Sequence, residues 1–135
     1  MKLTVRQFGW LAVGSLLITI GAGVSGVHSF AGQFWHVTAG FFLFFVGYRV
    51  AQLGLHPPSE GITATTVLIP GADPFSITGG LRLVAIPIGA IGIGWGVTQF
   101  SQTIVDPDLQ RAIVAGVASI AGYILAHFGL MEMKL

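Results

Sequence analysis

The chain contains no cysteine and very little charge. The absence of cysteine excludes disulfides, thiolate metal ligands and cysteine nucleophiles. Charged residues make up 8% of the 135 residues, whereas ordinary globular proteins contain about 25%. With only six Lys and Arg, the chain is too poor in basic residues to bind nucleic acid through a basic surface. Its apolar character also excludes intrinsic disorder, which requires low hydrophobicity.

Long apolar runs take the place of the missing charge. Apolar residues form 53% of the chain, and its mean hydropathy is +0.84. A helix needs about 20 predominantly apolar residues to cross the hydrocarbon, because each residue adds about 1.5 Å across a layer about 30 Å thick. Four segments meet this requirement, at residues 8–27, 34–54, 81–100 and 109–130. The runs are continuous rather than alternating, which favours helices over a β-barrel.

We therefore predict an all-α polytopic membrane protein with a single transmembrane domain over residues 1–135. Its four transmembrane helices form two tandem helical hairpins in parallel orientation, joined by a cytoplasmic connection over about residues 55–80. The first segment is longer than the 7–15 apolar residues of a signal peptide, so we expect it to be a permanent helix. Asp106 can cap the last helix, with Pro107 at its first position and Asp108 near its positive end.

The basic residues predict the orientation, because Lys and Arg near helix ends are retained on the cytoplasmic side of a membrane. In a four-pass chain only Arg111 falls on the side away from the termini. The other basic residues are Lys2, Arg6, Arg49, Arg82 and Lys134. We expect both termini to be cytoplasmic, or inside, in a cell membrane or in the envelope of a virus or vesicle.

The two hairpins resemble each other in sequence. The first and third segments align at an offset of 73, which pairs Ile20-Gly21 with Ile93-Gly94. The second and fourth align at an offset of 75, with the two-residue change in the outer turns, where insertions are tolerated. Their matched positions are Gly47-Tyr48 with Gly122-Tyr123, Ala51 with Ala126, and Gly54-Leu55 with Gly129-Leu130. We interpret the pattern as a tandem duplication whose copies are related by a pseudo-twofold axis along the membrane normal.

Glycine is abundant, with 20 residues in the chain. In lipid, helices associate through close packing, which small residues permit. The glycines that we predict to pack helices together are Gly23, Gly92, Gly96, Gly116 and Gly122. A four-helix unit has more such faces than it can use internally. We therefore expect it to form a homo-oligomer or to join a hetero-complex.

The apolar segments offer few groups for chemistry. None of them contains Asp or Glu, which disfavours pumps and ion-coupled carriers, because these place ionisable groups at membrane depth. No Ser/His/Asp constellation, phosphate-binding loop or zinc-protease motif is present. We expect no enzymatic activity, no catalytic residue, no metal and no cofactor.

Two alternatives to a purely structural protein remain. A b-type haem redox subunit needs pairs of axial imidazoles at one membrane level, and the candidate ligands are His28, His36, His56 and His127. The first two flank the outer turn, and the other two lie near the cytoplasmic boundary. A small oligomeric passive channel or facilitator could be lined by hydroxyl groups, with candidates Ser15, Thr19, Thr38, Thr98 and Ser119.

Two further features concern the cytoplasmic boundary. Arg49 and Arg82 are candidates for binding lipid headgroups, because long basic side chains near helix ends reach the membrane interface. The stretch from Thr63 to Ile69 is rich in β-branched residues, which predicts a strand-like segment. Since so short a segment forms no stable sheet alone, we expect it to pack on the helix ends, to lie among the headgroups or to bind a partner.

The leading hypothesis is a non-catalytic integral membrane protein that packs through its small-residue helix faces. It would act as a structural or accessory subunit of a membrane assembly, such as a larger complex or an enveloped particle. Its expected partners are membrane lipid and other subunits, and nucleic acid is not among them.

Overall fold

The computed structural model describes residues 3–58, 61–69, 73 and 75–130. In these ranges the regular secondary structure is entirely helical, and four helices are long and apolar enough to cross a membrane. They are α1 (Val5–Phe30), α2 (Phe34–Leu55), α4 (Ile77–Val105) and α5 (Leu109–Leu130), and a short helix, α3 (Ala64–Leu68), lies between α2 and α4. The predicted all-α, four-helix membrane architecture is confirmed. Lys2 and Lys134, two of the basic residues on which the predicted orientation rests, lie outside the described residues.

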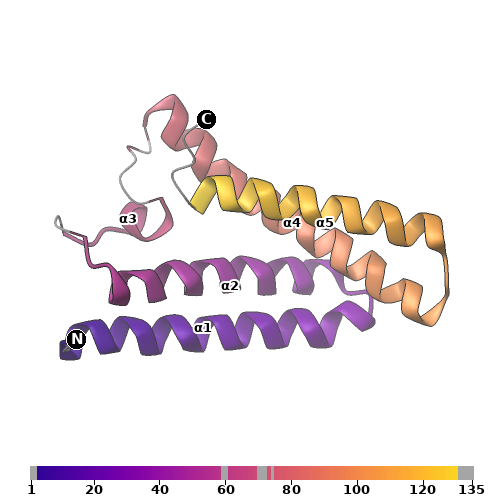
Figure 1. Cartoon of the computed structure of the whole chain (residues 1–135), viewed down its shortest axis with the longest axis horizontal. Helices are drawn as coiled ribbons and strands as arrows, with labels where there is room; N and C mark the ends of the chain where they lie inside the picture. The colour runs from indigo at the N-terminus through magenta and orange to yellow at the C-terminus, as the bar shows by residue number, and fades with distance from the viewer. Residues whose placement is uncertain (1–2, 59–60, 70–72, 74, 131–135) are drawn as a thin grey trace.

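The long helices form two antiparallel hairpins, α1–α2 and α4–α5. Figure 1 shows α4 crossing the first hairpin obliquely. The two short turns lie at one end of the bundle, the turn end, and α3 lies at the other, the α3 end. In the most apolar stretch of each helix, 50% of the residues are buried in α2 and 44% in α4, compared with 17% in α1 and 28% in α5. α2 and α4 are therefore central, and α1 and α5 are peripheral.

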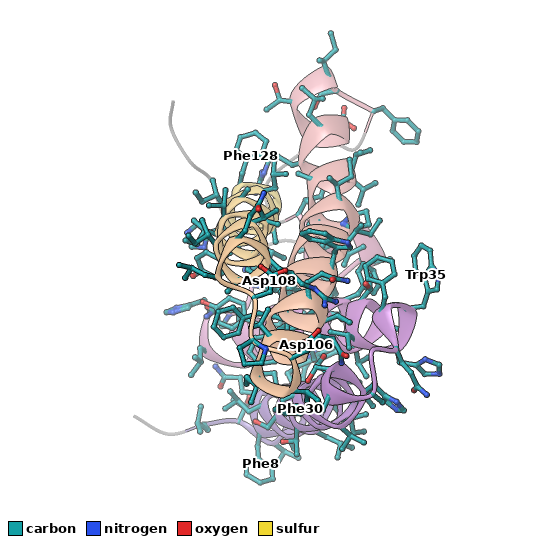
Figure 2. The ribbon with its side chains drawn as sticks, turned by 90° about the vertical axis from the view of Figure 1, so that its right-hand side faces the viewer. Phe8, Phe30, Trp35, Asp106, Asp108 and Phe128 are labelled. Atoms are coloured by element: carbon teal, nitrogen blue, oxygen red, sulfur yellow. The ribbon has the colours of Figure 1, made fainter. Side chains whose placement is uncertain are left out.

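The outer surface of the bundle is apolar. Figure 2 shows Phe8 of α1 and Trp35 of α2 pointing away from the helices, and both side chains are exposed. Ile113, Val117 and Ile120 are also exposed along α5. Water-soluble proteins rarely expose continuous apolar surface on this scale. The four apolar helices and this surface are those of an integral membrane protein.

Polar caps extend the helices beyond the predicted apolar segments. Thr4 begins α1 through a capping box, in which its hydroxyl accepts the N–H of Gln7 while the Gln7 side chain accepts the N–H of Thr4. Ser76 begins α4, and its Oγ accepts the N–H of Gly79 at 3.0 Å. Because α4 starts at residue 77 and continues to 105, it is considerably longer than the predicted 81–100. Hydropathy marks only the part of a helix that is apolar, so it misses these polar ends.

The turn between α4 and α5 contains two acidic residues with different roles, both visible in Figure 2. Asp108 caps α5, because its Oδ1 accepts the N–H of Arg111 at 3.0 Å. Asp106, the residue that the sequence suggested as the cap, instead ends α4 by donating its backbone N–H to the carbonyl of Gln102 at 2.9 Å. The prediction of a helix start here is correct, but the capping residue lies two positions later.

The stretch predicted to be strand-like is helical. Thr63 caps α3, because its Oγ1 accepts the N–H of Thr66 at 3.2 Å. This hydroxyl cap starts a helix despite the β-branched composition, so the strand prediction is wrong. The stretch does pack on the helices, the first of the three expected placements, since α3 contacts α2 and Ile69 is fully buried in the apolar core that includes Ile86 and Leu130.

The two hairpins make the same close contacts at positions 75 residues apart. In the first hairpin Gly14 lies against the backbone of Ala51, and in the second Gly89 lies against the backbone of Ala126. The helix bounds repeat in the same way, because α2 and α5 each have 22 residues and both ends of α5 follow those of α2 by 75 positions. The other equivalent glycines in these contacts are Gly21 with Gly96, Gly47 with Gly122, and Gly54 with Gly129.

This register corrects the sequence alignment of the first helices. The offset of 73 paired Gly21 with Gly94, whereas the contacts make Gly21 the counterpart of Gly96. Gly47 lies against the backbone nitrogen of Ile18 and Gly122 against that of Ile93, again 75 positions apart. One offset therefore relates both helices of the hairpins, and no insertion in the turns is needed. At the offset of 73 Ile20-Gly21 matches Ile93-Gly94, whereas at 75 Ile20 is paired with Trp95, so the sequence alone favoured the wrong register.

The two hairpins join through unlike faces. α4 packs on α2 and, less extensively, on α1. The twofold counterpart of the α2–α4 interface would be an interface between α5 and α1. In the described part of the chain α5 and α1 share no interface comparable to that of α2 and α4. The relation between the hairpins is therefore not the closed pseudo-twofold expected from the sequence.

Candidate functional site

Two of the candidate haem ligands lie together at the turn end. The rings of His28 and His36 stack with their centroids 4.6 Å apart and their planes at 28°, and a ring nitrogen of His28 bonds the side chain of Gln33. His28 lies in the last turn of α1, because that helix runs on to Phe30. Two axial imidazoles bind opposite faces of a haem and cannot touch face to face. The stacked pair therefore cannot supply both ligands of one iron.

The other two histidines occupy different settings. His56 ends α2, where it is exposed and donates its backbone N–H to the carbonyl of Gln52 at 2.7 Å. His127 lies on α5 beside Tyr123, with ring centroids 5.7 Å apart. The described residues contain no group of three or more His, Cys, Asp or Glu that could hold a metal ion. No observation here favours a haem or metal centre.

The hydroxyl groups considered for a pore mostly bond to their own helices. Thr19, Thr98 and Ser119 each donate to the carbonyl four residues earlier, at 2.9, 2.6 and 2.9 Å. In each of these bonds the hydroxyl donates its proton to the backbone of its own helix, so this proton is not directed toward a pore. Thr38 is buried, and its Oγ1 has no hydrogen-bond partner within the described residues. Ser15 is exposed on α1.

The predicted packing glycines fall into two groups. Gly92, Gly96 and Gly122 lie in the interface between α4 and α5, where a Cβ added to Gly122 would lie 2.6 Å from the backbone nitrogen of Ile93. Gly23 on α1 and Gly116 on α5 have no atom of another helix within 4 Å of an added Cβ. Their surfaces are therefore open to lipid or to another protein chain.

The two central arginines lie inside the bundle at the α3 end. Arg49 on α2 is 8% exposed and Arg82 on α4 is 5% exposed. The sequence placed both at one membrane level, and the structure brings them close enough for their positive charges to repel. Their burial differs from the expected arrangement, in which the side chains extend along the surface to the headgroups.

Arg49 holds α3 against the bundle. Its Nε donates to the backbone carbonyl of Val67, in α3, at 3.2 Å. Ile69 follows α3 directly and belongs to the apolar core, together with Ile86 of α4 and Leu130 of α5. The arginine therefore ties the connection between the two hairpins to the second helix. The sequence does not indicate Val67 as the partner, because a backbone carbonyl carries no residue-specific signal.

Arg82 differs from Arg49 in having unused donors. Its Nε and Nη2 are buried, and neither has a hydrogen-bond partner within the described residues. The backbone carbonyl of Arg82 lies beside Gly129 of α5, where an added Cβ would be 2.6 Å away. The end of α5 thus passes close to this arginine.

A groove lies between α2 and α5 near the same level. Its volume is about 150 Å³, and Phe44, Phe45, Tyr48, Tyr123, His127 and Leu130 line it. Tyr48 and Tyr123 occupy equivalent positions in the two hairpins, as the repeated Gly-Tyr pairs indicated. The lining is mainly apolar and aromatic, so the groove offers few polar groups to a ligand.

The chain matches no protein-family model, no curated protein and no solved structure. Its function must therefore be inferred from its own residues. Two features of the chain stand out. The two hairpins pack together through faces that are not equivalent, and Arg49 and Arg82 are buried where these hairpins meet.

Proposed function

We propose that the chain is a non-catalytic integral membrane protein that assembles with further copies of itself. In this proposal it serves as a structural or accessory subunit of a membrane assembly, with its termini and its α3 end on the cytoplasmic side. The supporting observation is the asymmetric join between two hairpins that otherwise repeat each other's contacts. We further propose that the hairpins arose by tandem duplication.

The face of α2 that binds α4 has an open counterpart on α5. Thr38 of α2 lies against Gly94 of α4, and Phe45 belongs to the core that α2 shares with α4. Adding 75 to these two α2 positions gives Ile113 and Ile120, which are 58% and 63% exposed. Gly116 lies between them with open space beside it. The second hairpin therefore carries an unoccupied version of the face that the first hairpin uses.

The face of α4 that binds α2 has an open counterpart on α1. Subtracting 75 from Gly94 and Ala90 gives Thr19 and Ser15, and both are exposed. Gly23, one turn further along α1, also has open space beside it. Small side chains along this stretch would let another helix approach closely, which is how helices associate in lipid.

Together these faces define a head-to-tail contact, in which α5 of one copy packs on α1 of the next. Such heterologous contacts close into a ring when the rotation between copies permits it. The counterpart of Arg49 in this contact is Ile124, which is 54% exposed. The contact between copies would thus lack the buried charge of the internal interface and remain apolar.

The oligomeric state of the full chain in mild detergent tests this proposal. We expect native mass spectrometry to give a discrete oligomer. Gly116→Leu should shift it to the monomer, because the larger side chain blocks close approach to α5. Ala121→Leu, at an exposed position on another side of α5, is the matched control and should leave the oligomer intact. A wild-type monomer, or equal behaviour of the two variants, would contradict the proposal.

A further inference from the structure

Arg82 presents one unpaired edge of its guanidinium group inside the protein. The side chain is only 5% exposed, and its Nε and Nη2 have no partner in the described part of the chain. These two nitrogens are neighbours on one edge of the planar group. Their N–H bonds run side by side, which suits two oxygens of a single carboxylate or phosphate. The free donors are thus arranged for a bidentate oxyanion.

The buried charge also requires compensation. Arginine stays protonated in proteins, and burying its charge without a counter-charge is strongly unfavourable. Arg49 increases the cost, because it is buried nearby and adds a second positive charge. Its hydrogen bond goes to the Val67 carbonyl, which carries no net charge. The pair therefore favours an anion bound between α2, α3 and α4.

The acidic side chains of the described residues form no ion pair with either arginine. Asp73 is exposed, and its Oδ1 accepts the backbone N–H of Phe75 at 3.0 Å. Asp106 and Asp108 are in the turn at the opposite end of the bundle. No ion pair to either arginine occurs within the described ranges. The counter-charge must come from outside this part of the chain.

We propose that Arg82, assisted by Arg49, binds a phosphate group at the α3 end, with the Nε–Nη2 edge of Arg82 holding two of its oxygens. The site is independent of assembly, because it lies within one copy. Arg49 is six residues from the end of α2, and Arg82 is five residues from the start of α4. These positions lie roughly 7–9 Å inside the helix ends, a depth that a phospholipid headgroup or a free phosphate ion could reach. Because the donors are covered, binding requires the chain over the site to shift.

Binding measurements on the full, delipidated protein in detergent test the site. Inorganic phosphate and micelles containing phosphatidylglycerol are titrated separately, with native mass spectrometry and the melting temperature as readouts. We expect one of them to bind at one equivalent per chain and to raise the melting temperature. Stabilisation by phosphate identifies the free ion, and stabilisation by the phospholipid alone identifies the headgroup. If neither binds, the proposal is wrong.

Variants separate this site from general attraction of anions to the membrane surface. Arg82→Gln should weaken binding at least about tenfold, the effect of losing charge-assisted hydrogen bonds. Arg82→Lys keeps the charge but lacks the bidentate edge, so it tests the same point if the glutamine variant does not fold. Arg6→Gln, at an exposed position near the start of α1, should leave binding unchanged. An equal loss in the Arg6 variant would overturn the proposal.

Internal carboxylates are the remaining competitors. Glu60, before α3, and Glu132, after α5, are the acidic residues outside the described ranges, and both are tested by substitution. We expect Glu60→Gln and Glu132→Gln each to retain phosphate or phospholipid binding at the wild-type affinity. If one of them instead destabilises the protein as much as Arg82→Gln, and its double variant with Arg82→Gln is no less stable than either single variant, that glutamate is the partner of Arg82 and the phosphate site does not exist.

Discussion

Gly89 in α4 lies directly against Ala126 in α5, where an added Cβ would be 2.5 Å from the alanine backbone nitrogen. Gly14 and Ala51 make the same contact in the first hairpin. Backbones this close leave no room for a side chain, so the two hairpins depend on glycine at equivalent places. Packing of this kind is the main source of helix association in lipid.

Gly89→Ala is expected to destabilise the protein by about 1–3 kcal/mol, the usual cost of overpacking a well-packed interior. Unfolding in increasing mole fractions of sodium dodecyl sulfate, followed by circular dichroism, measures the change. Gly9→Ala is the control, because an added Cβ at Gly9 meets nothing within 4 Å. A Gly89 variant as stable as the Gly9 variant would contradict the described α4–α5 contact.

The two acidic residues of the second turn should respond differently to substitution. Asp108→Ala removes the side chain that caps α5, and we expect a loss of about 1 kcal/mol in unfolding free energy. Asp106→Ala should have a much smaller effect, because its backbone N–H makes the bond that ends α4. The same unfolding assay compares them. A larger loss for the Asp106 variant would show that the cap is assigned to the wrong residue.

Arg49→Gln should release α3. The substitution removes the hydrogen bond from the guanidinium to the Val67 carbonyl, so the amides of residues 64–68 should exchange with deuterium faster while those in the centres of α2 and α4 do not. Hydrogen exchange with mass spectrometry resolves these segments. Arg6→Gln provides the comparison at the same end of the bundle. Unchanged exchange in α3 would mean that the Arg49 bond does not hold it.

The stacked histidines predict that haem does not bind at the turn end. Purified protein titrated with haemin should show no saturable bis-histidine Soret band, because His28 and His36 contact each other face to face. Absorption spectroscopy of the wild type and of His36→Ala makes the comparison. A stoichiometric Soret band that disappears in the variant would revive the haem-bearing alternative.

The sequence predicted the four helices well because membrane insertion leaves a strong signal in the length of each apolar run. It predicted helix ends less well, since Ser76 and Thr4 act through single hydrogen bonds at polar positions. The helix α3 escaped prediction for the same reason: Thr63 caps it, while its β-branched neighbours indicated a strand. Local capping outweighed composition there.

The site could be predicted only in part. The sequence placed Arg49 and Arg82 at one level, but it suggested that they face lipid. Their burial is a result of tertiary packing, which includes the hydrogen bond from Arg49 to the Val67 carbonyl. The similarity of α2 and α5 was visible in the sequence, while the matching contacts of α1 and α4 appeared only with the positions of Gly21 and Gly96. Tertiary packing, which no local pattern encodes, decided both questions.

The head-to-tail contact between copies is tested most directly by a disulfide between chains. Because the chain has no cysteine, two differently tagged versions can be co-expressed, one carrying Thr19→Cys and the other Ile113→Cys. These positions are the counterparts of Gly94 and Thr38, which lie in contact. Val114→Cys in place of Ile113→Cys is the matched control, about 100° around the helix at nearly the same depth. We predict a heterodimeric cross-link for the Thr19 and Ile113 pair and little for the control. Equal cross-linking by both pairs, or by neither, would contradict the account.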